Sequence, residues 1–109
     1  MTIESNIKPA IYRDKLFSRY FIDHLTSLPN LYKLRSDLED RAEFSLIVLN
    51  IDNFQMIHNF YGSLVGDFVL ETVGKLLSAR LDTLGIYRLL GDEFAILMDG
   101  SLGFYDLKS

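Results

Sequence analysis

The stretch Arg88-Leu89-Leu90-Gly91-Asp92-Glu93-Phe94 decides the fold, because it joins two short apolar runs through a turn. The run Ile86–Leu90 precedes the Gly91-Asp92 pair, and the run Phe94–Met98 follows Glu93. Two such runs around a glycine and an aspartate are typical of a β-hairpin. The sequence therefore predicts a hairpin near the end of the chain.

Upstream of the hairpin, the apolar spacing predicts one strand among several helices. The run Phe44–Ile51 contains Ile, Val and Leu in succession, which favours a strand buried on both faces. The other expected elements are a helix with Leu31, Leu34 and Leu38 on one face, a short helix from Asn53 to Tyr61 ended by Gly62, and a long helix with Ser63 as its N-cap. This order predicts an α+β fold with the strand and hairpin in one antiparallel sheet.

Both ends of the chain carry weaker patterns. After Pro9, the four-residue spacing of Tyr12, Leu16 and Tyr20 predicts an amphipathic helix to about Ile22. We therefore divide the chain into a linker helix over residues 1–22 and one domain over residues 23–109. At the other end, residues 99–109 are expected to form a loop, followed by the first turn of a helix around Tyr105, Leu107 and Lys108.

The bulk composition narrows the class of protein. The chain has 109 residues, of which 49% are hydrophobic, enough for one domain with a real core. A net charge of -4 disfavours nonspecific binding to nucleic acid or anionic membranes, and the lack of cysteine excludes disulfides and thiolate metal sites. The longest strongly apolar run, Leu46–Leu49, is too short to span a bilayer, and the first residues do not resemble a signal peptide. We expect a cytoplasmic domain.

Three segments, in order, resemble the motifs of one family. Asp23–Asn30 resembles D-x-L-T-G-L-P-N; Asn50–Leu70 resembles D-I-D-x-F-K-x-I-N-D-x-Y-G-H-x-x-G-D-x-V-L; and Arg88–Phe94 resembles R-x-G-G-D-E-F. On these motifs the chain is identified as a member of the GGDEF, or diguanylate cyclase, family. The resemblance implies a partial nucleotidyl-cyclase-like (ferredoxin-like palm) fold, an antiparallel sheet with packed helices. It also implies truncation, because the family continues with a helix, a strand and a last helix that hold the terminal phosphates.

The family joins two GTP molecules into cyclic-di-GMP, and the resemblance implies where its metal ions bind. Charge that develops on the phosphoryl oxygens is stabilised by divalent cations, which carboxylates hold. The implied ligands here are Asn50, where the family has Asp, the backbone carbonyl of Ile51, and Asp92. The Asn50 amide can coordinate Mg²⁺ but carries no charge, and Asp52 is expected on the same strand face about 6.6 Å away. Mg²⁺ is therefore expected only if nucleotide binds.

The resemblance also assigns guanine recognition to two positions, His58 and Asp67. His58 stands where the family has Asn and cannot reproduce the paired donor and acceptor of an amide, so an ordinary surface histidine is the alternative. Asp67 matches the family, and its alternative is an acidic first-turn helix residue favoured by the helix dipole.

The signature turn, Leu90, Gly91, Asp92, Glu93 and Phe94, departs from the family at its first position. Leucine replaces the first glycine, which we expect to restrict the backbone and to place a side chain where nucleotide would lie. Glu93 is the implied catalytic residue, with a solvent-facing strand residue as the alternative, and Phe94 is expected in the core. Gln55 replaces a lysine near the phosphates, and the product-inhibition motif R-x-x-D is missing.

Three hypotheses follow from these departures. The first is a degenerate, non-catalytic GGDEF domain that regulates or senses nucleotide, binds GTP weakly at most, and contacts another signalling domain. The second is an active diguanylate cyclase that works as a homodimer. The third is a nucleotide-independent dimerisation module that self-associates through the unpaired edge of the Phe44–Ile51 strand or through the aromatic face of the first helix.

Overall fold

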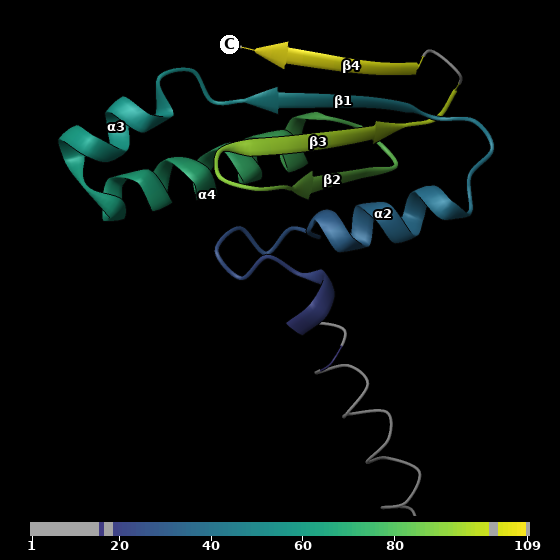
Figure 1. Ribbon diagram of the computed structural model, residues 1–109, viewed down its shortest axis with the longest axis horizontal. Coiled ribbons are helices and arrows are strands. Elements are labelled where there is room, and N and C mark those ends of the chain that lie inside the picture. Colours follow the sequence, from purple (N-terminus) through teal and green to yellow (C-terminus); the bar gives the residue numbers. More distant parts are fainter. Residues whose placement is uncertain (1–15, 17–18, 101–102, 109) are drawn as a thin grey trace, which may run out of the picture.

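The computed structural model of the chain describes residues 16, 19–100 and 103–108. Its elements are, in order, α2 (Leu31–Glu39), β1 (Ser45–Asn50), α3 (Phe54–Tyr61), α4 (Ser63–Arg80), β2 (Gly85–Arg88), β3 (Glu93–Met98) and β4 (Gly103–Lys108) (Figure 1). The predicted α+β class and the β2–β3 hairpin are confirmed. Most of the helix that we predicted up to Ile22 lies outside the described residues.

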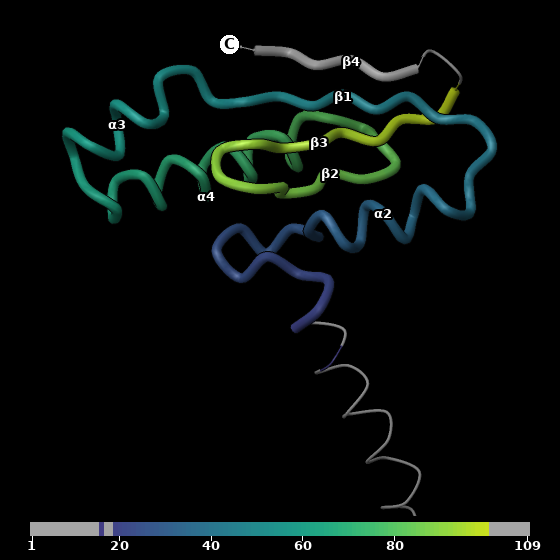
Figure 2. Tube along the Cα trace, in the orientation of Figure 1, coloured from purple at the N-terminus to yellow at the C-terminus, as the bar shows by residue number. Residues whose placement is uncertain are grey.

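One four-stranded sheet forms the centre of the fold, in the order β2-β3-β1-β4. β3 pairs antiparallel with both β1 and β2, whereas β4 pairs parallel with β1. Figure 1 shows β4 along the outer side of β1, and Figure 2 shows the traces of β1 and β3 side by side. The sheet is therefore antiparallel over three strands and acquires a parallel edge.

The strand β4 corrects two expectations about the chain's last residues. The residues around Tyr105 do not begin a helix but belong to a strand, with Ile47 opposite Tyr105 in the register. The edge of β1 that we expected to be free is therefore paired with β4. The prediction of self-association through an unpaired edge of this strand is wrong. The physical reason is that β1 offers a row of backbone donors and acceptors, and the Phe104-Tyr105 pair has strand preference.

Buried side chains lie on both faces of the sheet. On the face covered by α2 the cluster consists of Leu34, Leu46, Val48, Tyr87, Ala95 and Leu97. Strand periodicity sends Ile86, Phe94 and Ile96 to the opposite face, behind which α4 runs (Figure 1). The prediction that Phe94 belongs to the core is confirmed, since none of its surface is exposed.

Local capping sets the helix boundaries near the site. Gly62, with φ of +90°, ends α3 and directly precedes α4, so Ser63 is the first residue of α4 and not its N-cap. β1 ends at Asn50, so Asp52 lies in the following turn and not on the strand face where we expected it. The chain therefore leaves the sheet immediately after the candidate metal residue.

Candidate functional site

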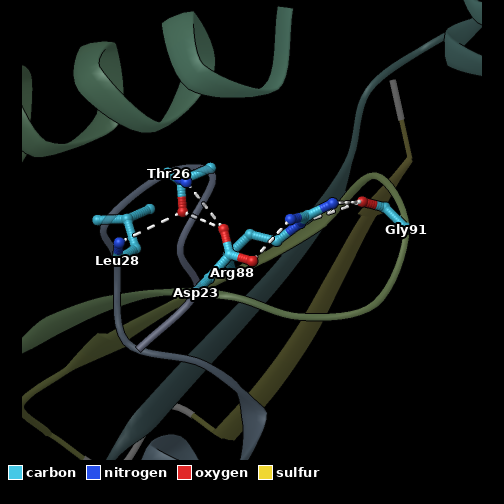
Figure 3. Close-up of polar contacts among 5 residues, drawn as sticks. All are labelled: Asp23, Thr26, Leu28, Arg88 and Gly91. Carbon is cyan, nitrogen blue, oxygen red and sulfur yellow. Dashed lines mark hydrogen bonds and ion pairs between the residues drawn. The ribbon is translucent and has the colours of Figure 1, made fainter. Parts of the chain in front are cut away.

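The first part of the site is a polar junction between the turn at residues 23–28 and the hairpin (Figure 3). Arg88 reaches across 65 residues of sequence, and its Nη1 donates to Asp23 Oδ1 at 2.9 Å. The second carboxylate oxygen of Asp23 accepts from the Thr26 amide at 2.9 Å and the Thr26 hydroxyl at 2.7 Å. Asp23 thus has a partner for each oxygen, and the junction fixes the opening motif to the signature motif.

The same arginine fixes the signature turn. Arg88 Nη2 and Nε donate to the carbonyl oxygen of Gly91 at 2.7 and 3.2 Å. The backbone N–H of Glu93 donates to the Leu90 carbonyl, and Gly91, with φ of +62°, is the one residue of this turn at positive φ. A positive φ at the first central position alone is typical of a type II′ turn, where glycine is preferred.

This geometry corrects part of the expectation for Leu90. Its φ is not positive, so leucine is accommodated there without backbone strain. The side chain is 69% exposed, and it lines one wall of a pocket of about 440 Å³ together with Asp23, Arg88 and Leu31. The departure from the family glycine therefore changes the surface beside the turn and leaves the turn itself intact.

The electrostatics of the junction favour an ionised Asp23. Burial raises the pKa of this carboxyl group, but hydrogen bonds from Thr26 and the positive charge of Arg88 outweigh burial and hold the pKa below its ordinary value. The Asp23–Arg88 ion pair is therefore present at neutral pH.

The second part of the site is the candidate metal corner, where β1 ends beside the start of β3. Asn50 lies opposite Glu93 in the β1–β3 register, and the Ile51 N–H donates to the Asp92 carbonyl at 3.3 Å. The Asn50 side-chain Nδ2 donates to Asp92 Oδ1 at 3.5 Å. The structure thus brings together four of the residues that the sequence singled out, and joins two of them by an amide–carboxylate hydrogen bond.

The donor set of this corner does not fit a pair of Mg²⁺ ions. Mg²⁺ takes oxygen ligands, and a cation between two carboxylates would offset their repulsion. Here one of the two side chains is a neutral amide whose N–H group, not its oxygen, faces Asp92. In the described part of the chain no three His, Cys, Asp or Glu side chains are grouped to hold a metal ion.

The two candidate guanine residues lie on the α3–α4 pair, and both are exposed. The His58 ring packs against Gly66, where an added Cβ would come within 3.1 Å of the ring, and its centroid is 6.3 Å from that of Phe54. His58 is therefore an exposed histidine whose ring lies beside Gly66 of the next helix, and its role stays a prediction. Asp67 lies four residues after the first residue of α4, which is beyond the first helical turn. The alternative, that the helix dipole favours an acidic residue at this position, is therefore wrong.

Sequence reasoning missed a second polar contact, between α2 and β2. The buried Tyr87 donates its hydroxyl to Asp37 Oδ2 at 2.6 Å, and Lys33 Nζ contacts the other oxygen of Asp37 at 2.6 Å. Burial and the Asp37 carboxylate raise the pKa of Tyr87. The one signal in the sequence was the tyrosine inside an apolar strand, since a buried phenol needs a hydrogen-bond partner.

No helix among the described residues is both long enough and apolar enough to cross a membrane.

The family described as diguanylate cyclase, GGDEF domain, matches residues 20–102. Diguanylate cyclase DgcS of Shewanella oneidensis is 28% identical over 102 residues, covering 85% of this chain and 34% of that protein. Probable diguanylate cyclase DgcI of Escherichia coli is 36% identical over 93 residues, covering 79% of this chain and 21% of that protein. The chain thus spans between a fifth and a third of these two relatives.

Solved structures are similar over much of the chain. A microbial GGDEF domain studied with cyclic di-GMP has a TM-score of 0.69 at 30% identity, covering 80% of this chain and 62% of that chain. The diguanylate cyclase SiaD from Pseudomonas aeruginosa, in complex with its activator SiaC, has a TM-score of 0.63 at 26% identity, covering 89% of this chain and 42% of that chain. With the family match over most of its length, the chain belongs to the GGDEF family of cyclic-di-GMP signalling.

Proposed function

We propose that this chain is a degenerate, non-catalytic GGDEF domain that acts as a regulatory or nucleotide-sensing module in cyclic-di-GMP signalling. The observation that carries the proposal is the Asn50–Asp92 hydrogen bond in the metal corner. The Asn50 amide donates to one oxygen of the remaining carboxylate, so Asp92 has a polar partner in this corner without a cation. The corner is thus suited to keeping the β1–β3 end together and poorly suited to holding metal ions on a reacting phosphate.

Two further residues support the loss of catalysis. One edge of the His58 ring faces Gly66 of α4, where an added Cβ would come within 3.1 Å of it. Leu90 extends an apolar side chain into solvent beside the signature turn. Neither residue offers phosphate or guanine the hydrogen bonds that the family's amide and bare backbone supply.

Weak nucleotide binding remains part of the proposal, since Asp67 is exposed and can accept hydrogen bonds from guanine. Mg²⁺ belongs to this proposal only as a companion of bound GTP, and otherwise no cofactor is required. We propose a cytoplasmic location and a contact with another signalling domain, as SiaD has with its activator.

The proposal is tested by incubating the chain with GTP and Mg²⁺ and measuring cyclic-di-GMP by chromatography. We expect no product. Steady formation of cyclic-di-GMP, abolished by Asp92→Asn, would overturn the non-catalytic assignment. GTP titration by calorimetry then separates a weak nucleotide sensor from a module with no nucleotide role.

An active cyclase is the second candidate, supported by the retained Asp67, Asp92 and Glu93. On that account Asn50→Asp, His58→Asn and Leu90→Gly together should raise turnover from a measurable wild-type level. On our account the wild-type level is zero, so any product appears only after the three changes.

A further inference from the structure

The strand β4 brings a lysine to the candidate metal corner. β4 pairs in parallel with β1, from Gly103 opposite Ser45 to Lys108 opposite Asn50. On the other side of β1, Asn50 lies opposite Glu93, the first residue of β3. Glu93, Asn50 and Lys108 therefore form one row across three strands, at the end of the sheet where β1 and β4 finish and β3 starts (Figure 1).

The corner carries an excess of negative charge. Asp92 and Glu93 come from the hairpin, and Asp52 follows Asn50 by two residues. The ion pairs found among the described residues lie on α2 and at the Arg88 junction, so they do not neutralise these three carboxylates. Like charges that lie close together repel, and a positive charge near them lowers their energy. A cation at this end of the sheet would therefore stabilise it.

A lysine can supply this charge where the corner does not suit a metal ion. The Asn50 amide directs an N–H group at Asp92, which does not fit the oxygen ligands that Mg²⁺ requires. A lysine ammonium group needs no such set of ligands, since it is a compact charge on a flexible stem. The disagreement between the family's metal site and this corner is thus resolved by a residue of the chain itself.

The spacing of the strands brings the charges within range of each other. Neighbouring strands lie about 4.7–4.9 Å apart, so Glu93 and Lys108, two strands apart, are separated by roughly 10 Å along the row. That separation is close to the Debye length, about 8–10 Å at ordinary ionic strength. Opposite charges at these positions therefore attract in dilute buffer, and concentrated salt screens the attraction.

The lysine comes from a segment beyond the family match. The match ends at residue 102, and β4 begins at Gly103. The position of Lys108 therefore depends on the pairing of β4 with β1 and not on any of the three motifs.

We propose that Lys108 is the resident positive charge of the corner and takes the electrostatic role of a metal cation there. Its ammonium group offsets the repulsion among Asp52, Asp92 and Glu93 and favours the paired arrangement of β3, β1 and β4. The inference rests on the proposed loss of metal-dependent catalysis, and it adds which group stabilises the corner instead.

A spin label tests the placement of Lys108. The chain has no cysteine, so Ser109→Cys can carry a single nitroxide beside Lys108 without changing the lysine. We expect the label to broaden the NMR amide signals of Asn50 and Glu93 more than that of Ser45, at the other end of β1. Strongest broadening at Ser45, or no broadening along β1, would overturn the proposal.

Urea unfolding of Lys108→Gln tests the charge. In about 10 mM salt we expect the equilibrium constant for unfolding to rise about two- to fivefold, and the difference from the wild type to vanish in about 1 M salt. Lys108→Arg keeps the charge and should match the wild type. The matched control is Lys75→Gln at an exposed position of α4, which should show no such salt-dependent difference.

A double-mutant cycle with Glu93→Gln identifies the partner charge. In that background, Lys108→Gln should have less than about half of its effect, because one of the carboxylates is gone. A full effect there, a difference that persists in concentrated salt, or equal effects of Lys108→Gln and Lys75→Gln would overturn the proposal. Formation of cyclic-di-GMP would instead overturn the proposed function and leave these results standing, so the two failures are distinguishable.

Discussion

The junction around Arg88 and the metal corner around Asn50 flank the same hairpin, yet they differ in how their polar groups are satisfied. At the junction, one guanidinium donates to Asp23 and to Gly91 with distances between 2.7 and 3.2 Å. At the corner, the Asn50 side-chain amide donates to Asp92 Oδ1 at 3.5 Å. The junction is a network of short hydrogen bonds from one guanidinium, whereas the amide–carboxylate contact at the corner is long and weak.

The difference separates what the fold needs from what the reaction needs. The ion pair and the Gly91 turn hold the opening segment against the hairpin, so we expect their loss to lower the free energy of unfolding. The residue types at Asn50 and Leu90 are compatible with the same backbone, since β1 runs to Asn50 and Leu90 adopts no positive φ. The fold therefore tolerates these residue types at both positions.

The largest expected effect comes from breaking the junction with Arg88→Ala. The substitution removes the ion pair and leaves Asp23 mostly buried without its charged partner. We expect the free energy of unfolding, measured with urea, to fall by about 2–3 kcal/mol. The control, Arg80→Ala at the exposed end of α4, should change it by less than about 0.5 kcal/mol. Equal effects of the two substitutions would remove the distinction between junction and surface.

A smaller effect is expected from two neighbouring changes in the signature turn. In Gly91→Ala the added Cβ would have no atom within 4 Å, but the alanine would have to keep φ of +62°. We therefore expect the free energy of unfolding to fall by about 1–2 kcal/mol. Leu90→Gly restores the family residue and should change stability by less than about 0.5 kcal/mol, because Leu90 is exposed. If Leu90→Gly were the costlier change, our account of the turn would be wrong.

The smallest expected effect is on how the stability of the chain depends on pH through Asp23. The pKa of Asp23 is lower in the folded chain than in the unfolded one, so its contribution is fully present above the unfolded value of about 4. That contribution is lost as the pH falls through the lower folded pKa. Asp23→Asn should therefore lose less stability between pH 5 and pH 3 than the wild type, as followed by urea midpoints. Parallel losses in the two proteins would show that this carboxyl group is not the one titrating.

Much of the fold could be predicted from local pattern. The spacing of Leu31, Leu34 and Leu38, the apolar run of β1 and the Gly91-Asp92 turn each fix an element by themselves. The last strand could not be predicted this way, because residues 103–108 become a strand by pairing with β1, more than 50 residues earlier in the chain. That pairing depends on a free sheet edge, which no local pattern records.

The site could be predicted as a set of residues but not as a set of contacts. The motifs identified four candidate site residues, Asn50, Ile51, Asp92 and Glu93. The β1–β3 register places them together. The group that donates a hydrogen bond to Asp92 is set by side-chain geometry. The spacing of residues along the sequence does not determine that geometry. The Tyr87–Asp37 bond was missed for the same reason, since its partners are 50 residues apart. The roles of these residues in chemistry stay predictions.

The most direct test of our central claim is the dependence of stability on Mg²⁺ in the wild type and in Asn50→Asp. In the wild type the Asn50 amide donates to Asp92 and supplies no second negative charge for a cation, so millimolar Mg²⁺ should leave the melting temperature unchanged. In Asn50→Asp, two carboxylates face each other without the amide donor, and we expect a loss of about 1–3 kcal/mol that Mg²⁺ reverses. Stabilisation of the wild type by Mg²⁺, lost in Asp92→Asn, would contradict the claim that this corner has given up its metal.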